Sequence, residues 1–182
     1  MATKFDKLNS EIIRFIGDQH IYFCATAGKE GYVNVSPRDT KTLKIINDNK
    51  IVWLNFTGSG NETSTHIQEN GRMTLMFCGF EQEALMLKIY GQAKVYHPRD
   101  KQYNELISLF DDDKNFVGNR QIFELDIELA ITSCGEGVPY FDYQGEREAL
   151  KTWSNQKGKD GIKEYWKENN SISIDGVDTK IV

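Results

Sequence analysis

A glycine-rich loop in the middle of the chain combines residue types that suit the binding of an anion: Thr57-Gly58-Ser59-Gly60-Asn61-Glu62-Thr63. It follows an apolar run at residues 51–56 that indicates a buried strand, and it leads into a short polar helix at residues 64–70. Glycines let the backbone approach a ligand closely, and the free N–H groups of a first helical turn point toward it. The loop therefore indicates a phosphate group, and with it a phosphorylated cofactor.

A helix cap is the simpler interpretation of the same residues. Ser59 and Glu62 have the spacing of a capping box, and Asn70-Gly71 suits the end of the helix that follows. The loop has neither the Gly-Lys-Ser/Thr ending of a nucleotide-binding P-loop nor the spacing of a dinucleotide fingerprint. A Glu62 carboxylate would also oppose a bare phosphate unless it turned away. On the loop alone, a ligand site and a cap both stay open.

The other residues that could do chemistry are scattered along the chain. Three cysteines lie far apart, which favours buried, reduced thiols: Cys24, Cys78 and Cys134. The histidines show no metal-binding spacing, so we expect no metal site: His20, His66 and His97. For His66, a surface or packing role is favoured over contact with a phosphate. For Cys134, in a glycine-rich turn, an inert thiol is favoured over a reactive one.

Length and composition indicate one ordinary globular domain. The chain has 182 residues, of which 39% are hydrophobic and 27% are charged, and its net charge is −5. A mildly acidic chain without a basic stripe argues against a nucleic acid partner. No apolar run is long enough to span a bilayer, and the N-terminus has no secretory signal pattern. We therefore expect no membrane partner and a cytoplasmic location.

The hydrophobic pattern predicts the elements that must position these residues. Six strands are predicted, at residues 21–27, 32–36, 51–56, 73–78, 85–96 and 122–131. Pro37 is expected to end the second strand, and Gly91 to bend or bulge the fifth. Leu43, Ile45 and Ile46 are expected in a short helical or irregular link.

Helices are predicted at residues 8–16 and 97–110, and the chain turns polar and helical beyond residue 140. Because the strands come mostly as antiparallel neighbours, the pattern predicts a mainly β fold, a small antiparallel barrel with peripheral helices. We expect a single domain over residues 1–182, with a barrel core at 1–140 and a C-terminal helical extension at 141–182.

Four segments of the chain together carry a family likeness: Val33-Asn34-Val35-Ser36-Pro37-Arg38, the glycine loop, residues 69–77 and residues 88–93. In order and residue type they resemble the pyridoxamine 5′-phosphate oxidase-like flavoproteins. Residues 134–139 and 173–176 resemble one uncharacterised branch of that family. The likeness covers nearly the whole chain. It implies a six-stranded split β-barrel that binds FMN and is usually a homodimer, with the flavin in a cleft between the subunits.

The resemblance also implies which residues line the flavin. The glycine loop would lie near the flavin phosphate, while the strand ending at Arg38 and the strand ending at Phe56 would line the ring and the ribityl chain. The expected FMN-binding residues are Asn34, Val35, Ser36, Pro37, Arg38, Asn55, Phe56, Thr57, Gly58, Ser59, Asn61, Glu62, Thr63 and Lys88. Four aromatic residues could cover the ring, although a place in the core or a dimer interface is favoured: Tyr140, Phe141, Trp153 and Trp166. No catalytic residue is assigned.

This chain departs from the family pattern in two places. Phosphate-binding members carry a basic pair where this chain has Glu62-Thr63. The phosphate charge would then be met by backbone N–H groups, the Thr63 hydroxyl and basic residues elsewhere, with Arg38, Lys88 and Arg72 as candidates. The chain also lacks the arginine-containing C-terminal motif of genuine pyridoxamine phosphate oxidases, which argues against a pyridoxal precursor as its substrate.

Three functional hypotheses remain. The first is an FMN-dependent oxidoreductase that moves two electrons through the flavin N5, with a nicotinamide or a small organic molecule as its partner. The second is a non-catalytic flavin-binding module for storage or sensing. The third is a split barrel that holds haem or a deazaflavin, or that has lost its cofactor.

Overall fold

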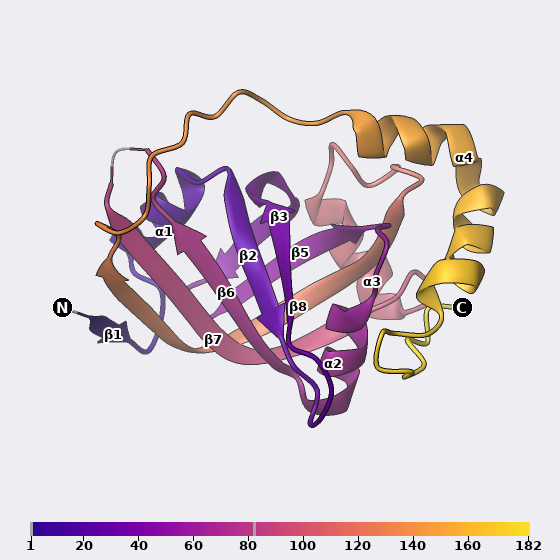
Figure 1. Cartoon of the computed structure of the whole chain (residues 1–182), viewed down its shortest axis with the longest axis horizontal. Coiled ribbons are helices and arrows are strands. Elements are labelled where there is room, and N and C mark those ends of the chain that lie inside the picture. Colours follow the sequence, from indigo (N-terminus) through magenta and orange to yellow (C-terminus); the bar gives the residue numbers. More distant parts are fainter. Residues whose placement is uncertain (1, 82) are drawn as a thin grey trace.

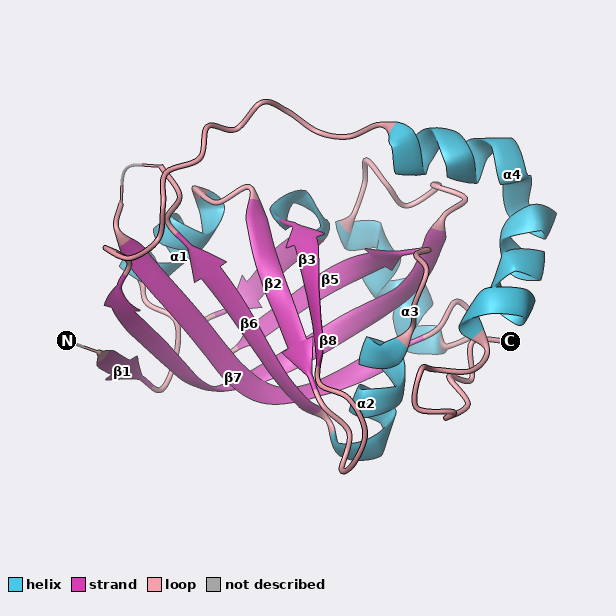
Figure 2. Cartoon of the chain, viewed as in Figure 1, coloured by secondary structure: helices cyan, strands magenta, loops and turns pink. Residues whose placement is uncertain are grey.

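The computed structural model describes residues 2–81 and 83–182, which form one curled antiparallel sheet with helices around it (Figure 1). The described strands are β1 (Thr3–Phe5), β2 (Ile21–Thr26), β3 (Asn34–Asp39), β4 (Leu43–Asn47), β5 (Lys50–Phe56), β6 (Arg72–Cys78), β7 (Leu85–Tyr96) and β8 (Asn119–Cys134). Their order in the sheet is β3-β2-β6-β7-β8-β5-β4, and β1 pairs with β8. The helices, shown in Figure 2, are α1 (Ser10–Gly17), α2 (Glu62–Asn70), α3 (Lys101–Leu106) and α4 (Ala149–Tyr165). The predicted mainly β split barrel with peripheral helices is confirmed.

The curled sheet encloses one main hydrophobic core. Trp53 of β5 stacks on Phe123 of β8 with 4.4 Å between ring centroids, and Tyr22 of β2 stacks on Phe77 of β6 at 5.4 Å. All four rings are buried, so folding removes their large apolar surface from water. The predicted N-terminal helix is confirmed as α1, which adds its buried apolar face to this core.

Two strands were missed by the hydrophobic pattern, so the described sheet has eight strands where six were predicted. Leu43, Ile45 and Ile46 do not lie in an irregular link; they form β4, which pairs in antiparallel register with β5. The strand was missed because its apolar residues do not alternate regularly with polar ones along the sequence. Leu43 is buried while Ile46 is exposed, so hydrophobicity does not follow burial in this strand. β1 has only three residues and none is buried, so it leaves no hydrophobic signal.

Pro37 does not end its strand, as the sequence predicted. β3 runs on to Asp39, and Pro37 pairs with Phe23 of β2. β3 lies at the edge of the sheet, where a residue without an N–H group can be tolerated. The irregularity predicted at Gly91 is confirmed, because the pairing of β7 with β8 shifts register between Tyr90 and Gly91.

The capping box that the sequence left open at the start of α2 does not form. The helix begins at Glu62 with Asn61 as its N-cap residue, and no side chain bonds to the cap. Ser59 therefore lies too far ahead of the helix to cap it. The predicted stop is confirmed, because Gly71 has a φ of 72° and donates its N–H to the Ile67 carbonyl.

The C-terminal part of the chain returns to the glycine loop. Residues 135–148, which we call the strap, cross above the sheet toward α4 in Figure 1. α4 is kinked at Gly158 and continues into one π-helical turn, Trp166–Asn170, and then into the C-terminal tail, residues 171–182. Over the described ranges, no helix has both the length and the apolar character needed to cross a membrane.

Candidate functional site

The sheet is split between β3 and β5, and the glycine loop lies at this split. β3 is hydrogen-bonded only to β2 within the described sheet, and β5 lies near the opposite end of the strand order. A 2.8 Å hydrogen bond from Arg38 Nη1 to Asn55 Oδ1 joins the two strands. Beside it, β3, the glycine loop, the start of α2 and the start of β8 enclose a cavity of about 560 Å³, which we call the loop cavity.

Eight of the predicted FMN-binding residues line the loop cavity: Asn34, Ser36, Arg38, Gly58, Ser59, Asn61, Glu62 and Thr63. A 3.0 Å hydrogen bond from Asn34 Nδ2 to Thr63 Oγ1 connects β3 with α2 along this wall. Five lining residues were not among the expected FMN-binding residues: Tyr32, Val33, Gly60, Arg120 and Ile174, of which Val33 and Gly60 lie in segments that the sequence had singled out. The structure thus brings the two ends of the predicted site together.

Arg38 is held by a chain of buried polar side chains. Asn55, which accepts from Arg38, donates to Gln121 at 3.0 Å, and Gln121 Nε2 lies 3.4 Å from His97 Nε2. The guanidinium also lies 5.0 Å from the centroid of the Trp53 ring. Burial lowers the pKa of His97, which favours the neutral form of its imidazole in this row of hydrogen-bonded side chains. Asn55, predicted to line the flavin, is therefore a buried residue that positions Arg38.

Arg120, at the start of β8, is the second guanidinium at the loop cavity. It is only 2% exposed, and its Nη1 donates to Asn170 Oδ1 at 2.8 Å and to the Gly58 carbonyl at 3.4 Å. Both acceptors are neutral. Burial, and next the charge of Arg38, lower the pKa of Arg120 to about 9.

Three lining residues carry buried polar atoms that find no hydrogen-bond partner among the described residues: Nε of Arg38, Nε of Arg120, and both Nδ2 and Oδ1 of Asn61. Buried polar groups are rarely left unpaired, so such atoms point to a water, an ion or a ligand. Two belong to cations, and the third residue caps the positive end of α2 without a side-chain bond. The residues present therefore fit a phosphate group.

Glu62 is the acidic member of the same lining. A Cβ atom added to Gly60 would lie 2.2 Å from Glu62 Oε2, so the carboxylate lies against the loop. A bare phosphate site would favour a Glu62 side chain that turns away from the loop, and this side chain does not turn away. Glu62 therefore places a negative charge beside the two guanidinium groups of this cavity.

The remaining predicted residues lie elsewhere. Pro37 and Phe56 line a second cavity; the Val35 side chain is exposed, and Thr57 is buried behind the loop. The Thr57 hydroxyl donates to the Gly118 carbonyl at 2.9 Å and accepts from Trp166 Nε1 at 2.9 Å. Lys88 is exposed on β7 and lines neither cavity, so the structure does not bring it to the loop.

Arg72, the third basic candidate, also lies apart from the site. It is exposed on β6, where its side chain donates to Asn70 and to the Gly28 carbonyl, and it lines neither cavity. Of the three basic candidates from the sequence, the structure leaves only Arg38 at the loop.

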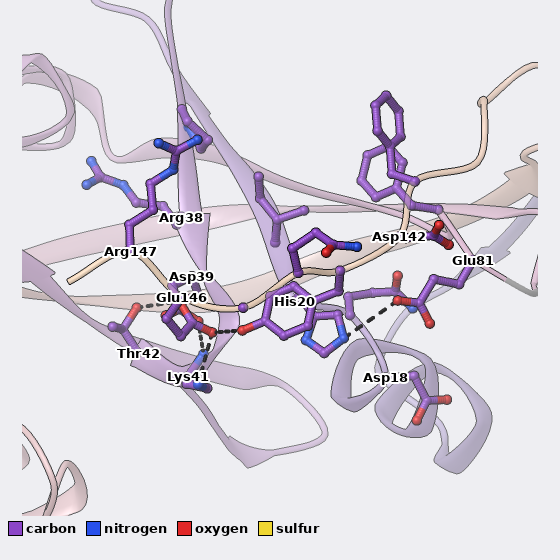
Figure 3. Close-up of a pocket in the computed structure, with 18 of the residues that line it drawn as sticks. Asp18, His20, Arg38, Asp39, Lys41, Thr42, Glu81, Asp142, Glu146 and Arg147 are labelled. Atoms are coloured by element: carbon purple, nitrogen blue, oxygen red, sulfur yellow. Dashed lines mark hydrogen bonds and ion pairs between the residues drawn. The ribbon is translucent and has the colours of Figure 1, made fainter. Parts of the chain in front are cut away.

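The second cavity is larger, about 1100 Å³, and lies between the barrel and the strap, so we call it the strap cavity. Arg38 lines both cavities, so the two meet at its side chain. In Figure 3, Arg38 and Arg147 lie toward one end of the strap cavity, while Glu81 and Asp142 lie toward the other. Arg147 makes no ion pair with any other described residue.

Contacts at the protein surface hold the strap over this cavity. The Tyr143 ring stacks on His20 with 3.7 Å between centroids, and Lys41 Nζ lies 2.9 Å from Glu146 Oε1. The Tyr143 hydroxyl, followed by Lys41, lowers the pKa of Glu146 to about 2. The Phe141 N–H also donates to the Phe80 carbonyl at 3.0 Å.

The four aromatic residues named from the sequence have different places. Phe141 lines the strap cavity, whereas Tyr140 is 83% exposed. Trp153 packs edge to face on Tyr165, and Trp166 is buried with its indole N–H on Thr57. Among these four residues, only Phe141 lines a described cavity. Trp153 and Trp166 pack against other residues of the protein, as the sequence favoured over a place on the flavin ring.

The cysteines and His66 lie outside both cavities. Cys24 and Cys78 are buried as predicted, and burial raises the pKa of Cys24 to about 12, which suits an inert thiol. Cys134 is exposed at the end of β8, so the prediction of burial is wrong there. His66 is buried and its Nδ1 lies 3.0 Å from Thr26 Oγ1, which confirms a packing role. Within residues 2–81 and 83–182, no three metal-ligating side chains gather into a cluster.

Arg120 and Asn170 are the site residues that sequence reasoning missed most clearly. The strand prediction began at Ile122, so Asn119-Arg120-Gln121 was left in a connecting segment, although these polar residues directly precede a buried strand. That polar start was the available signal. Asn170 follows a helical pattern far along the chain, and only the fold brings it to the loop.

Comparisons with known proteins agree with the fold. The family model described as pyridoxamine 5′-phosphate oxidase matches residues 8–134. A curated relative, the pyridoxamine 5′-phosphate oxidase family protein ustO of Aspergillus flavus, is 28% identical over 97% of this chain and 77% of its own length. The chain therefore belongs to the pyridoxamine 5′-phosphate oxidase family.

Two solved structures share the fold at low sequence identity. A putative pyridoxamine 5′-phosphate oxidase from Lactobacillus delbrueckii is 16% identical with a TM-score of 0.52, over 69% of this chain and 94% of that one. HutZ, the heme storage protein from Vibrio cholerae, is 18% identical with a TM-score of 0.50, over 71% of this chain and 98% of that one. At this identity the likeness concerns the fold alone.

Proposed function

We propose that this protein binds FMN and acts as an FMN-dependent oxidoreductase. The observation that carries the proposal is the loop cavity, where two arginines and the start of α2 converge on buried polar atoms without partners. These residues lie where the family resemblance implies the flavin phosphate. The flavin ring would extend past Arg38 toward Pro37 and Phe56, which line the strap cavity.

Bound FMN would supply two-electron transfer, and this chain would supply binding and orientation. Arg38 is suited to orient the flavin because it lines both cavities and is fixed through Asn55. The strap cavity is large enough for a small organic substrate and has aromatic walls at Phe56 and Phe141. The chain lacks the C-terminal arginine motif, so we propose a substrate other than a pyridoxal precursor.

Haem binding is the second candidate, and His20 favours it. HutZ is described as a heme storage protein. Here His20 lines the strap cavity, which is the larger one, and histidine is a common axial ligand of haem iron. His20 stacks on Tyr143 and lies 3.8 Å from Glu81, so the strap would have to release it before it could bind iron.

A visible spectrum of the purified protein, with and without added FMN or haem, tests the proposal. Yellow flavin bands that persist through desalting would support FMN, while a Soret band would favour haem. A colourless protein that retains no added FMN would refute the flavin proposal. Anaerobic mixing of the FMN-loaded protein with NADH and NADPH then tests catalysis, because a failure to bleach with either would favour a non-catalytic flavin module or another donor.

We also propose a homodimer with the flavin at the interface. The support is an exposed apolar group beside the loop cavity, in which Tyr32, Val33 and Val35 are each at least 60% exposed. Light scattering of the purified chain tests it, and a monomer at micromolar concentration would refute it. The cytoplasmic location stays a prediction from the sequence.

A further inference from the structure

We propose that Arg120, held by Asn170 of the C-terminal extension, is the cation that recognises the phosphate of FMN in this protein. It would act in place of the basic pair that Glu62-Thr63 replaces. This inference rests on the proposed function, and it adds a specificity for the phosphorylated flavin over riboflavin.

The first observation is that Arg120 is a buried cation without an anionic partner. Its guanidinium donates to Asn170 Oδ1 and the Gly58 carbonyl, which are neutral, and none of the ion pairs among the described residues includes Arg120. Its Nε atom is buried without any partner. A buried charge is costly to leave uncompensated, so a guanidinium at a cavity wall favours an anion in that cavity.

The second observation is that Asn170 fixes Arg120 and the glycine loop together. Asn170 is fully buried, and its Oδ1 accepts from Arg120 while its Nδ2 donates to the carbonyls of Gly58 at 3.1 Å and Ser59 at 3.2 Å. In a trans peptide the N–H group points opposite to the carbonyl. The N–H groups of Ser59 and Gly60 are therefore directed away from Asn170, and neither donates a hydrogen bond to another backbone group of the described residues.

The third observation is that one π-helical turn holds three consecutive loop residues. Trp166 donates to Thr57 at one end of the turn, and Asn170 holds Gly58 and Ser59 at the other. Such turns are rare and are often found at functional sites. The tail reinforces the arrangement, because the Thr179 hydroxyl donates to the Asn170 carbonyl at 2.5 Å. The C-terminal extension is thus built into the phosphate end of the site.

Glu62 does not satisfy Arg120 on its own. Its charge acts on Arg120 and opposes the lowering of the pKa of Arg120, but the two groups form no ion pair. Arg38 adds a second positive charge to the same lining. A phosphate dianion would therefore meet two guanidinium groups and one carboxylate, with loop N–H groups completing its hydrogen bonds.

The test compares the affinities of FMN and riboflavin, which differ by the phosphate alone. Flavin fluorescence quenching is titrated with the full-length wild-type chain, with R120Q, R120K and N170A, and with R72Q as the matched control outside both cavities. In R120Q, FMN affinity should fall about 10- to 100-fold while riboflavin affinity stays within about twofold. R120K and N170A should lower the FMN preference by smaller factors, and R72Q should keep it.

Each outcome decides the inference. A wild-type chain that binds neither flavin would overturn the proposed function, and this inference with it. A wild-type chain that prefers FMN, together with an R120Q variant of unchanged preference, would overturn this inference alone. If R120Q does not fold, as judged by circular dichroism, R120K and N170A decide, and an unchanged FMN preference in both would overturn it.

Discussion

The loop cavity and the strap cavity meet at Arg38 but are built in opposite ways. Around the loop cavity, the groups that fix the wall are buried: Arg120 is 2% exposed and Asn170 is fully covered. Around the strap cavity, the contacts that close the wall lie at the surface, and Tyr143 is 43% exposed and Phe141 61%. The ion pair of Lys41 and Glu146 is likewise exposed at its lysine.

One cleft can thus combine fixed recognition at its buried end with variable recognition at its exposed end. Buried hydrogen-bonded groups hold a geometry closely, which suits a cofactor that must always sit in one place. Surface ion pairs and exposed stacking are weak, so we expect that opening the strap would cost little free energy. We infer that the loop cavity serves cofactor recognition, and that the strap cavity admits what the cofactor acts on.

The largest effect is expected from Arg38→Gln, because Arg38 belongs to both cavities. Loss of the guanidinium should lower the affinities for FMN and for riboflavin alike, by about 10- to 100-fold. The reason is that Arg38 would lie near the flavin ring, which both ligands share, as well as near the phosphate. Fluorescence titration with both flavins measures this. A loss confined to FMN would show that Arg38 serves only the phosphate end, and the two cavities would then not share it.

Trp166→Phe should have an intermediate effect and test the buried side. It removes the indole N–H that donates to Thr57 while keeping an aromatic ring in place. The free energy of unfolding should fall by about 1 kcal/mol, and FMN affinity should fall because the loop loses one of its supports. Urea unfolding of the apo protein and flavin titration measure the two changes. Trp153→Phe is the matched control, because Trp153 packs on Tyr165 and its indole N–H makes no hydrogen bond to the described residues of the loop.

Tyr143→Ala should have a smaller effect on binding and test the exposed side. It removes the stack on His20 and the contact with Glu146, so the strap should be cut faster by protease, while FMN affinity stays within about twofold. Limited proteolysis followed by mass spectrometry locates the cuts. If FMN affinity fell as far as in R120Q, the strap would be part of the cofactor site, and the contrast between the cavities would fail.

pH should affect the two cavities in separate windows. Burial, and next the charge of Arg38, lower the pKa of Arg120 to about 9, while the charges of Glu62 and Tyr165 act in the opposite direction. The preference for FMN over riboflavin should therefore decline as the pH rises through about 9. The pKa of Glu146 is depressed to about 2, so its contribution to strap closure is present above its ordinary pKa and is lost as the pH falls toward 2. Titrations from pH 6 to 10 measure the first change, with R120Q as the flat control. Proteolysis by an acid-active protease from pH 5 to 2 measures the second.

The smallest effect is expected from Glu62→Gln, and its sign is opposite. Removing the carboxylate that lies against Gly60 should tighten FMN binding by a few-fold and leave riboflavin unchanged, because a like charge near the phosphate is removed. Weaker FMN binding in E62Q would mean that the carboxylate orders the loop more than it repels the ligand.

The sequence predicted the parts of the molecule that depend on local pattern. The strands with long apolar or alternating runs were found, and the glycine loop was placed correctly between β5 and α2. β4 was missed because it forms a strand by pairing with β5. Pro37 was expected to end its strand, but β3 continues past it because it pairs with β2. A pattern along one chain segment cannot show which strand lies beside it.

The site divides in the same way. Eight residues of the loop cavity were predicted because they lie in two contiguous segments. Arg120 and Asn170 were missed because they are distant from the loop in sequence. Arg120 follows Gly58 by 62 positions and Asn170 follows it by 112 positions, and only the fold brings them together. Lys88 and Arg72 were named for their charge, but each is exposed on its strand and lines neither cavity.

We propose above all that the loop cavity recognises the phosphate of a flavin. The most direct test of this proposal is a calorimetric titration of purified, ligand-free wild-type chain with FMN and, in parallel, with riboflavin. We predict binding of one FMN per chain, at least about tenfold tighter than riboflavin. Equal affinities for the two flavins, or no binding of FMN at all, would show that the loop cavity is not a flavin phosphate site.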